Sequence, residues 1–405
     1  MANQLGKGPK LEYIITGLFQ NEGYLSRRSI PLYYGNKNQD ATDIDVLGIV
    51  FTKPFQMHKI ICDCKNKQKS KPYERIFWVK GLSQFVNAEQ TYVSLPQASW
   101  EISKFAQDGG VRVLTGDIIN QYFSGNSNLF GIADDTFYVE FFDKFNNTIK
   151  KNKNLYASAN ALKALYLNED PYVSVNVAME TLSVAGKHLK LSKENNLEEE
   201  YSFWKYICCE SMIIISLSIL NICSDTICLP IKARKERILT KLTYGDIEPF
   251  RINTILNYAK NVANEIIKEN IPRNMISKLD LVDFGQITPP SYASTIIGIV
   301  ERAIKNQEWY INLPQVLDFI LFEFAVKNKE FSMDDFKKVF NSDNYEGKLK
   351  AAKNILSLAR NICNIDLKLL WGNNKGIILS TNEELDLKED KRMKEEFTQI
   401  DMKIN

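Results

Sequence analysis

Histidine is almost absent from this chain of 405 residues, which contains only His58 and His188. Histidine is the side chain that most often serves as a general base near neutral pH and as a zinc ligand. Its scarcity therefore argues against hydrolase sites that depend on histidine, including most zinc sites. Seven cysteines occur without the paired spacing of a metal site. Their odd number and the lack of an export signal predict a reducing, cytoplasmic location.

Three further features are missing from the sequence. The first seven residues lack the apolar segment of a signal peptide. The longest apolar run, at 212–220, is too short to span a bilayer, so we expect a buried helix there and no membrane association. No GxxxxGK[ST] sequence occurs, so the chain does not hydrolyse a nucleotide through a P-loop. Any NTP-driven step would require another polypeptide.

Two short apolar runs near the N-terminus carry carboxylates. The first contains Asp43 and Asp45, and the second contains Asp63 followed two residues later by Lys65. Both runs are rich in Ile, Val and Phe and too short for helices, which predicts two strands joined by a turn at Pro54. In an antiparallel hairpin centred there, Asp45 lies opposite Asp63 and Asp43 lies opposite Lys65. Because side chains alternate along a strand, all four then share one face.

Facing carboxylates of this kind need a compensating positive charge. Like charges opposed across a sheet are destabilising, and two close carboxylates do not both ionise cheaply. A divalent cation supplies the charge, and oxygen ligands favour Mg²⁺ or Mn²⁺. A lysine beside such a metal can orient water and stabilise charge on a phosphate, so the pattern suits phosphodiester hydrolysis. A structural ion pair between Asp43 and Lys65 is the alternative explanation.

The segments before the hairpin add one acidic and two basic candidates. Residues 11–19 have helical periodicity, and Glu12 lies at the edge of their apolar stripe. Glu12 is therefore either a solvated flank or a third acidic group that reaches the metal. The next segment, 24–34, predicts a strand, whose Arg27 and Arg28 could contact phosphates but are expected to face water.

A basic segment follows the hairpin. Between residues 59 and 80 there are seven basic residues against two acidic ones, whereas the whole chain has a net charge of only +2. The basic residues that we expect near a nucleic-acid backbone are Lys67, Lys69, Lys71 and Arg75, the last within a helix predicted over 73–87. Clustered cations attract phosphates, although a solvated loop would have the same composition. Gln84 is spaced to lie on the Lys80 side of that helix.

The order of these elements, completed by a strand over 90–95, resembles the PD-(D/E)xK, or restriction-endonuclease-like, nuclease superfamily. The resemblance covers roughly the first 95–125 residues and rests on Glu12, on Asp45 after an apolar residue and on Asp63-x-Lys65. It implies that Asp45, Asp63 and the backbone carbonyl of Cys64 hold the metal. Asp43 is a competing ligand, but Asp45 fits the family pattern better.

The resemblance also implies roles for three other side chains. Lys65 would position or activate the attacking water, Glu12 would complete the metal shell or orient water, and Gln84 would face the site. DNA is then the expected substrate ahead of RNA, and restriction or anti-phage defence is the expected setting by analogy at the level of the fold. The alternative is a catalytically silent nucleic-acid-binding or assembly subunit that retains the fold.

The whole sequence predicts an α/β domain with a mixed sheet flanked by helices over residues 1–125, followed by a mostly α-helical domain over 130–380. Residues 381–405 form a charge-dense tail. The helical domain would select substrate, form an oligomer or bind a partner protein. Its aromatic clusters at 203–206 and 309–310 are expected to pack in the core or against a partner rather than stack on bases. The predicted helices cover 139–152, 156–167, 173–189, 197–222, 251–269, 294–306, 313–328, 333–340 and 345–364.

Overall fold

The N-terminal part of the protein is a five-stranded sheet in the order β1-β2-β3-β4-β5. The computed structural model describes residues 7–34, 39–64, 71–125, 136–270, 287–340 and 344–371. The strands are β1 Leu25–Tyr34, β2 Gln39–Thr52, β3 Gln56–Cys64, β4 Gln90–Leu95 and β5 Val111–Thr115. The first three strands pair antiparallel, and β3, β4 and β5 pair parallel. The prediction of a mixed sheet flanked by helices is confirmed.

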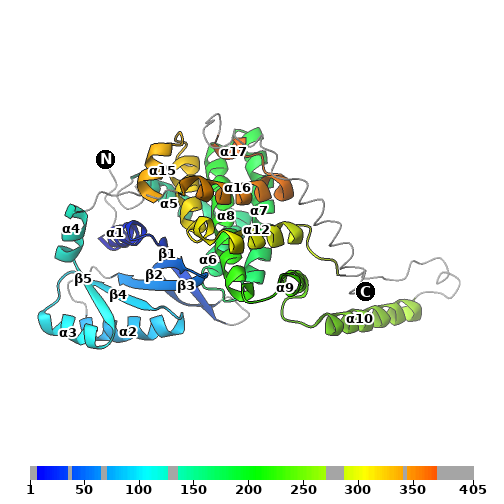
Figure 1. Cartoon of the computed structure of the whole chain (residues 1–405), viewed down its shortest axis with the longest axis horizontal. Coiled ribbons are helices and arrows are strands. Elements are labelled where there is room, and N and C mark those ends of the chain that lie inside the picture. The colour runs from blue at the N-terminus through cyan, green and yellow to red at the C-terminus, as the bar shows by residue number, and fades with distance from the viewer. Residues whose placement is uncertain are drawn as a thin grey trace.

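Helices cover both faces of this sheet. Helix α1 Lys7–Asn21 lies on one face, and the crossover helices α2 Pro72–Phe85 and α3 Trp100–Asp108 lie on the other (Figure 1). The even-numbered residues Val46 and Cys62 pack with α1, whereas the odd-numbered Leu47 and Ile61 share a core with α2. The period of two along β2 and β3 therefore decides which side chains meet which helix. Helix α4 Gly116–Gly125 follows β5.

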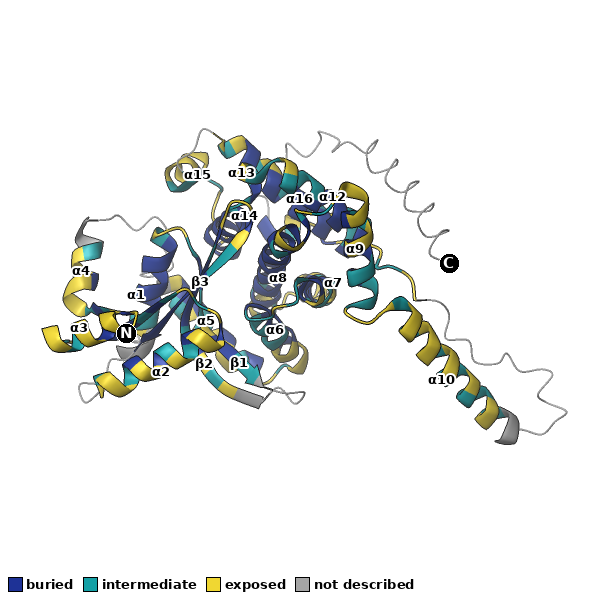
Figure 2. Ribbon diagram, turned by 60° about the horizontal axis from the view of Figure 1, so that its bottom comes forward, coloured by how far each residue is buried: buried dark blue, intermediate teal, exposed yellow. Residues whose placement is uncertain are grey.

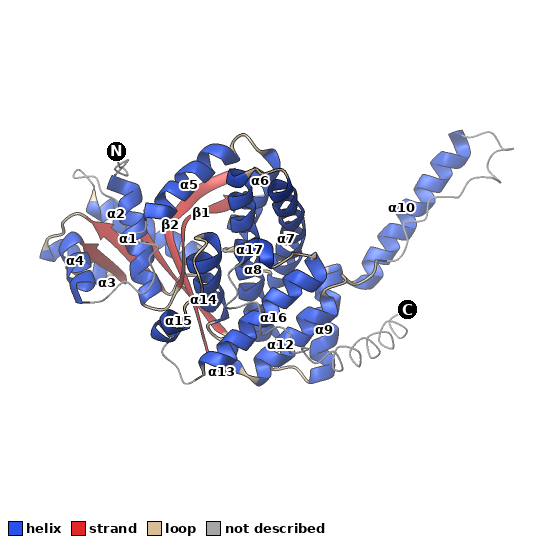
Figure 3. Cartoon of the chain, turned by 90° about the horizontal axis from the view of Figure 1, so that it is seen from above, coloured by secondary structure: helices blue, strands red, loops and turns tan. Residues whose placement is uncertain are grey.

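The rest of the described chain is helical, as predicted. Its helices are α5 Thr136–Ile149, α6 Lys153–Leu165, α7 Pro171–Glu194, α8 Glu198–Thr226, α9 Ile231–Tyr244, α10 Pro249–Asn270, α12 Ala293–Lys305, α13 Gln307–Tyr310, α14 Leu313–Asp318, the π-helix η1 Phe319–Val326, α15 Met333–Phe340, α16 Tyr345–Cys363 and α17 Lys368–Trp371. Helix α10 extends away from the other helices (Figure 3). The single helix predicted over 313–328 is instead α14 followed by the π-helix.

Helix α8 is the centre of the helical part and is buried along most of its length (Figure 2). It contains the apolar run at 212–220. Within the described residues it is the one helix long and apolar enough to cross a membrane, and 89% of its apolar window is buried in the protein. The aromatic residues Trp204 and Tyr310 are also buried. The core interpretation of both aromatic clusters is thus confirmed.

The sheet and the helical part share one hydrophobic core, in which β1 contacts α6 and α14 while β3 contacts α8. Arg27 of β1 points into this junction. Its guanidinium donates to both oxygens of Glu210, at 2.9 and 3.0 Å, and to Asp318 at 2.8 Å. The expectation that Arg27 faces water is therefore wrong, because its two acidic partners come from helices far away in the sequence.

Close packing at Gly347 gives a test of this helical core. A methyl group added to Gly347 of α16 would overlap the indole of Trp309, whereas one added to the exposed Gly81 of α2 would meet no atom within 4 Å. We expect Gly347→Ala to lower the free energy of unfolding by about 1–3 kcal/mol. Gly81→Ala should raise it by about 0.5–1 kcal/mol, because alanine favours a helix. Urea unfolding measures both; equal effects would contradict the packing.

Candidate functional site

The β2–β3 hairpin has the register that the sequence predicts. Its paired residues run from Thr52 opposite Gln56 to Val46 opposite Cys62. The next residues in that register are Asp45 and Asp63, which lie on the odd-numbered face of the sheet together with α2. The two carboxylates are therefore at the same end of the hairpin and on the same side, where the sequence analysis expects a site.

Asp63 is buried and is bound by an arginine. The Nε of Arg75, in the first turn of α2, donates to one carboxylate oxygen at 2.9 Å, and Nη2 donates to the other. The Asp63 side chain is 7% exposed, against 25% for Arg75. Burial lowers the pKa of Arg75, and the charge of Asp45 opposes that shift. Within the described part of the chain, the guanidinium thus bonds Asp63 directly and brings a positive charge close to Asp45.

Asp45 is held by the backbone of the neighbouring strand. One of its carboxylate oxygens accepts the backbone N–H of Cys64 at 2.7 Å. The thiol of Cys64 points to the opposite face, where it lies 3.9 Å from the thiol of Cys62. The hydrogen bond between the Cys64 and Cys62 thiols and the burial of Cys64 raise the pKa of the Cys64 thiol. The charges of Asp45 and Glu12 act in the same direction. The two thiols are free and buried, so they form no bridge.

Glu12 lies on α1, which covers the other face of the sheet from Asp63. Its carboxylate is 3.6 Å from the guanidinium of Arg28. Arg28 is also stacked on Tyr13, at 3.4 Å from the ring centre, and its side chain is only 18% exposed. The expectation that Arg28 faces water is therefore wrong. Glu12 and Arg28 line a cavity of about 450 Å³ that also includes Lys163.

The structure describes only some of the residues that we expected near a nucleic-acid backbone. Lys65, Lys67 and Lys69 lie outside the described residues. Lys71 is exposed and bonds Glu74 at 2.7 Å. Gln84 is also exposed, and nine residues place it about two and a half turns from Arg75, on the opposite side of the helix. The structure therefore brings Arg75 to the acidic pair, but not Gln84.

The donor set at this end of the hairpin suits a hard divalent cation. Two carboxylates and the Cys64 carbonyl are the oxygen ligands that Mg²⁺ and Mn²⁺ prefer. Across the described residues, no group of three or more His, Cys, Asp or Glu side chains is arranged to hold a metal. A cation bound to Asp45 and Asp63 would compete with Arg75 for Asp63. The site is thus chemically compatible with a metal and is balanced by arginine without one.

Comparison of the chain with models of protein families, with curated proteins and with solved structures gives no match. Function must therefore be argued from the residues. Sequence reasoning placed Arg75 near a phosphate backbone and missed its bond to Asp63. The sequence did contain a signal for this bond. Arg75 lies in the first turn of the helix that follows the strand of Asp63, only twelve residues along the chain.

Proposed function

We propose that this chain is a Mg²⁺- or Mn²⁺-dependent nuclease that hydrolyses phosphodiester bonds, with DNA as the expected substrate. The observation that carries the proposal is the hairpin register, which runs to Val46 opposite Cys62 and, continued by one residue, would bring Asp45 opposite Asp63 on one face of the sheet. Facing carboxylates destabilise a sheet unless a positive charge compensates them, and a divalent cation with oxygen ligands supplies such a charge.

Each residue near the acidic pair would have its own role in the reaction. Asp45, Asp63 and the carbonyl of Cys64 would hold the metal, which when bound polarises the phosphate and its attacking water. Lys65 would orient or deprotonate that water. Glu12, which pairs with Arg28 on the other face of the sheet, is left out of the metal site. Arg75, which bonds Asp63 in this structure, would be able to pair instead with a phosphate oxygen, which its guanidinium can bind through two N–H groups.

The substrate and setting rest on the resemblance and on charge. Lys67, Lys69 and Lys71, which follow Asp63 in the sequence, would add sequence-independent attraction for a nucleic-acid backbone. DNA is favoured over RNA, in a cytoplasmic restriction or anti-phage defence role, and no membrane is involved. The helical part would select substrate, form a homo-oligomer or bind a partner protein.

One observation favours a second candidate function. Because Arg75 already neutralises Asp63, the chain can hold its acidic pair without any metal. That arrangement also suits a catalytically silent nucleic-acid-binding or assembly subunit that retains the nuclease fold. Metal binding and cleavage separate the two functions, since only the nuclease requires both. Cleavage of plasmid, linear duplex, single-stranded DNA and RNA in Mg²⁺ is the direct test.

Metal binding can be measured without any substrate. A ligand that binds only the native state raises its stability, so we expect Mn²⁺ to raise the thermal midpoint of the wild type and to leave Asp63→Asn unchanged. Arg75→Met should melt lower without metal and respond more strongly to Mn²⁺, because Asp63 has lost its competing cation. Asp108→Asn on α3 is the matched control. A Mn²⁺ response of equal size in all four proteins would contradict a metal at Asp63.

A further inference from the structure

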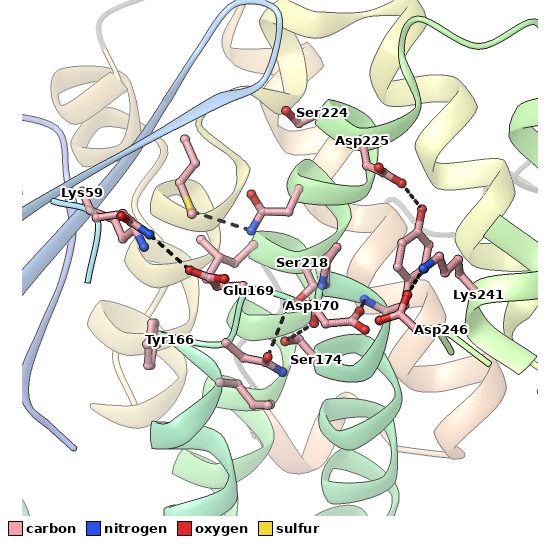
Figure 4. Close-up of a pocket in the computed structure, with 18 of the residues that line it drawn as sticks. Lys59, Tyr166, Glu169, Asp170, Ser174, Ser218, Ser224, Asp225, Lys241 and Asp246 are labelled. Carbon is pink, nitrogen blue, oxygen red and sulfur yellow. Dashed lines mark hydrogen bonds and ion pairs between the residues drawn. The ribbon is translucent and has the colours of Figure 1, made fainter. Parts of the chain in front are cut away.

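A polar cleft lies at the other end of β3 from the acidic pair. It has a volume of about 670 Å³ and lies between the start of β3, the α6–α7 turn and helices α8 and α9 (Figure 4). Small-molecule sites in proteins commonly have volumes of this order. Lys59, which lines the cleft, is four residues before Asp63, about 13 Å along the strand. The cleft is therefore separate from the proposed nuclease site.

Lys59 is the unusual residue of this cleft. It lies in a central strand, and only 8% of its surface is exposed. Its backbone N–H donates to Glu89 at 2.6 Å, but its ammonium makes no hydrogen bond, and no ion pair within 4.0 Å, to any described residue. Burial lowers its pKa, opposed by the charges of Glu169 and Glu89. The stem of Lys59 is buried and its ammonium lines the cleft without a partner among the described residues, so an anionic group in the cleft can pair with it.

The other charges that line the cleft already have protein partners. Asp225 accepts two N–H groups of Arg237, both at 2.8 Å, and the hydroxyl of Tyr172 at 2.7 Å. Lys241 pairs with Asp246. Figure 4 shows Asp225, Lys241 and Asp246 across the cleft from Lys59 and Glu169. The binding potential of the cleft is therefore concentrated at its Lys59 end.

Glu169 provides the opposite charge at that end. Its carboxylate is exposed and accepts one hydrogen bond, at 3.2 Å, from the neutral amide of Asn87. Its charge acts on Lys59, yet the two groups stay more than 4.0 Å apart. An anion alone would meet the carboxylate of Glu169, and a cation alone would leave Lys59 without a partner. A molecule that carries both charges satisfies both residues.

We propose that the cleft binds a small zwitterion of the α-amino acid class, with its carboxylate on Lys59 and its ammonium on Glu169. Ser224 of α8 also lines the cleft and offers its hydroxyl to the rest of the ligand. This binding is independent of nuclease chemistry.

The test is thermal unfolding of the full chain with each common amino acid in turn, at about 10 mM. We expect at least one amino acid to raise the midpoint, and the rise to grow with the logarithm of its concentration. Lys59→Met and Glu169→Gln should each weaken binding at least about tenfold, since each removes a charged partner. Lys104→Met, which removes an exposed lysine on α3, should bind as the wild type does.

Two results would overturn the proposal. One is that no amino acid raises the midpoint of the wild type. The other is that acetate or methylamine alone, at the same concentration, gives as large a rise as the best amino acid, which would show an ionic cleft without selectivity for a zwitterion. Lys59→Met replaces a largely buried lysine with an apolar side chain of similar length, so we expect the variant to fold and to unfold cooperatively. If it does not fold, the exposed Glu169→Gln still decides the matter.

Discussion

Replacing Arg27 with methionine should lower the free energy of unfolding by about 3–5 kcal/mol. The substitution leaves Glu210 and Asp318 buried without their cation. Their side chains are only 5% and 2% exposed, so water cannot replace the guanidinium. Tyr166 also donates to Glu210, at 2.6 Å, but a neutral hydroxyl does not balance two carboxylates. The loss should therefore exceed that of any surface ion pair.

Urea unfolding of wild type and Arg27→Met measures this effect, with the exposed Arg360→Met as the matched control. Adding Glu210→Gln and Asp318→Asn to Arg27→Met should restore much of the stability, because the buried charges are then gone. If Arg27→Met costs no more than the control, the guanidinium does not join the sheet to the helical part.

The same variant should depend on pH in a defined direction. Burial raises the pKa of Asp318, and the charge of Arg27 opposes that shift, so removing Arg27 raises the pKa further. A carboxyl whose native pKa lies above its unfolded value binds its proton more tightly in the native state. Stability is then lost as pH rises through this interval. We expect the loss of unfolding free energy in Arg27→Met to become smaller as the pH is lowered from neutral toward the pKa that Asp318 has in the unfolded chain.

Replacing Lys65 with alanine should slow phosphodiester cleavage by about 10²–10⁴-fold, the usual contribution of a group that acts on the water in the transition state. Asp63→Asn should be at least as damaging, because it removes a metal ligand rather than the group beside it. The rate of plasmid nicking under single-turnover conditions measures both, and Lys104→Met is the control. Cleavage by Lys65→Ala at the wild-type rate would exclude its role.

The elements and the hairpin were predictable because they follow from local patterns. Short apolar runs around Pro54 specify the two strands and their turn, and the spacing of the runs specifies the register, which runs to Val46 opposite Cys62. The helices of the second part follow from the period of their apolar residues. Helix α9 was missed because its buried face includes Arg234, which is satisfied by backbone carbonyls and Glu301.

The contacts between distant segments were not predictable. The partners of Arg27 are 183 and 291 residues away, and no local pattern links them. The same holds for Lys59, whose surroundings come from the α6–α7 turn. Arginines and lysines are mostly exposed to solvent, so residue type alone predicts exposure for Arg27 and Lys59, whereas both are largely buried. Helical spacing correctly put Gln84 on the Lys80 side of α2. It could not tell that this side faces solvent rather than the acidic pair.

We propose that the acidic hairpin supports metal-dependent cleavage of DNA. The most direct measurement is incubation of plasmid, linear duplex, single-stranded DNA and RNA with wild type and with Lys65→Ala, in Mg²⁺, in Mn²⁺ and in EDTA. We expect the wild type to cut DNA only when a metal is present, and Lys65→Ala to leave it intact. If the wild type cuts none of the four and its stability does not respond to Mn²⁺, the hairpin is structural and the nuclease proposal is wrong.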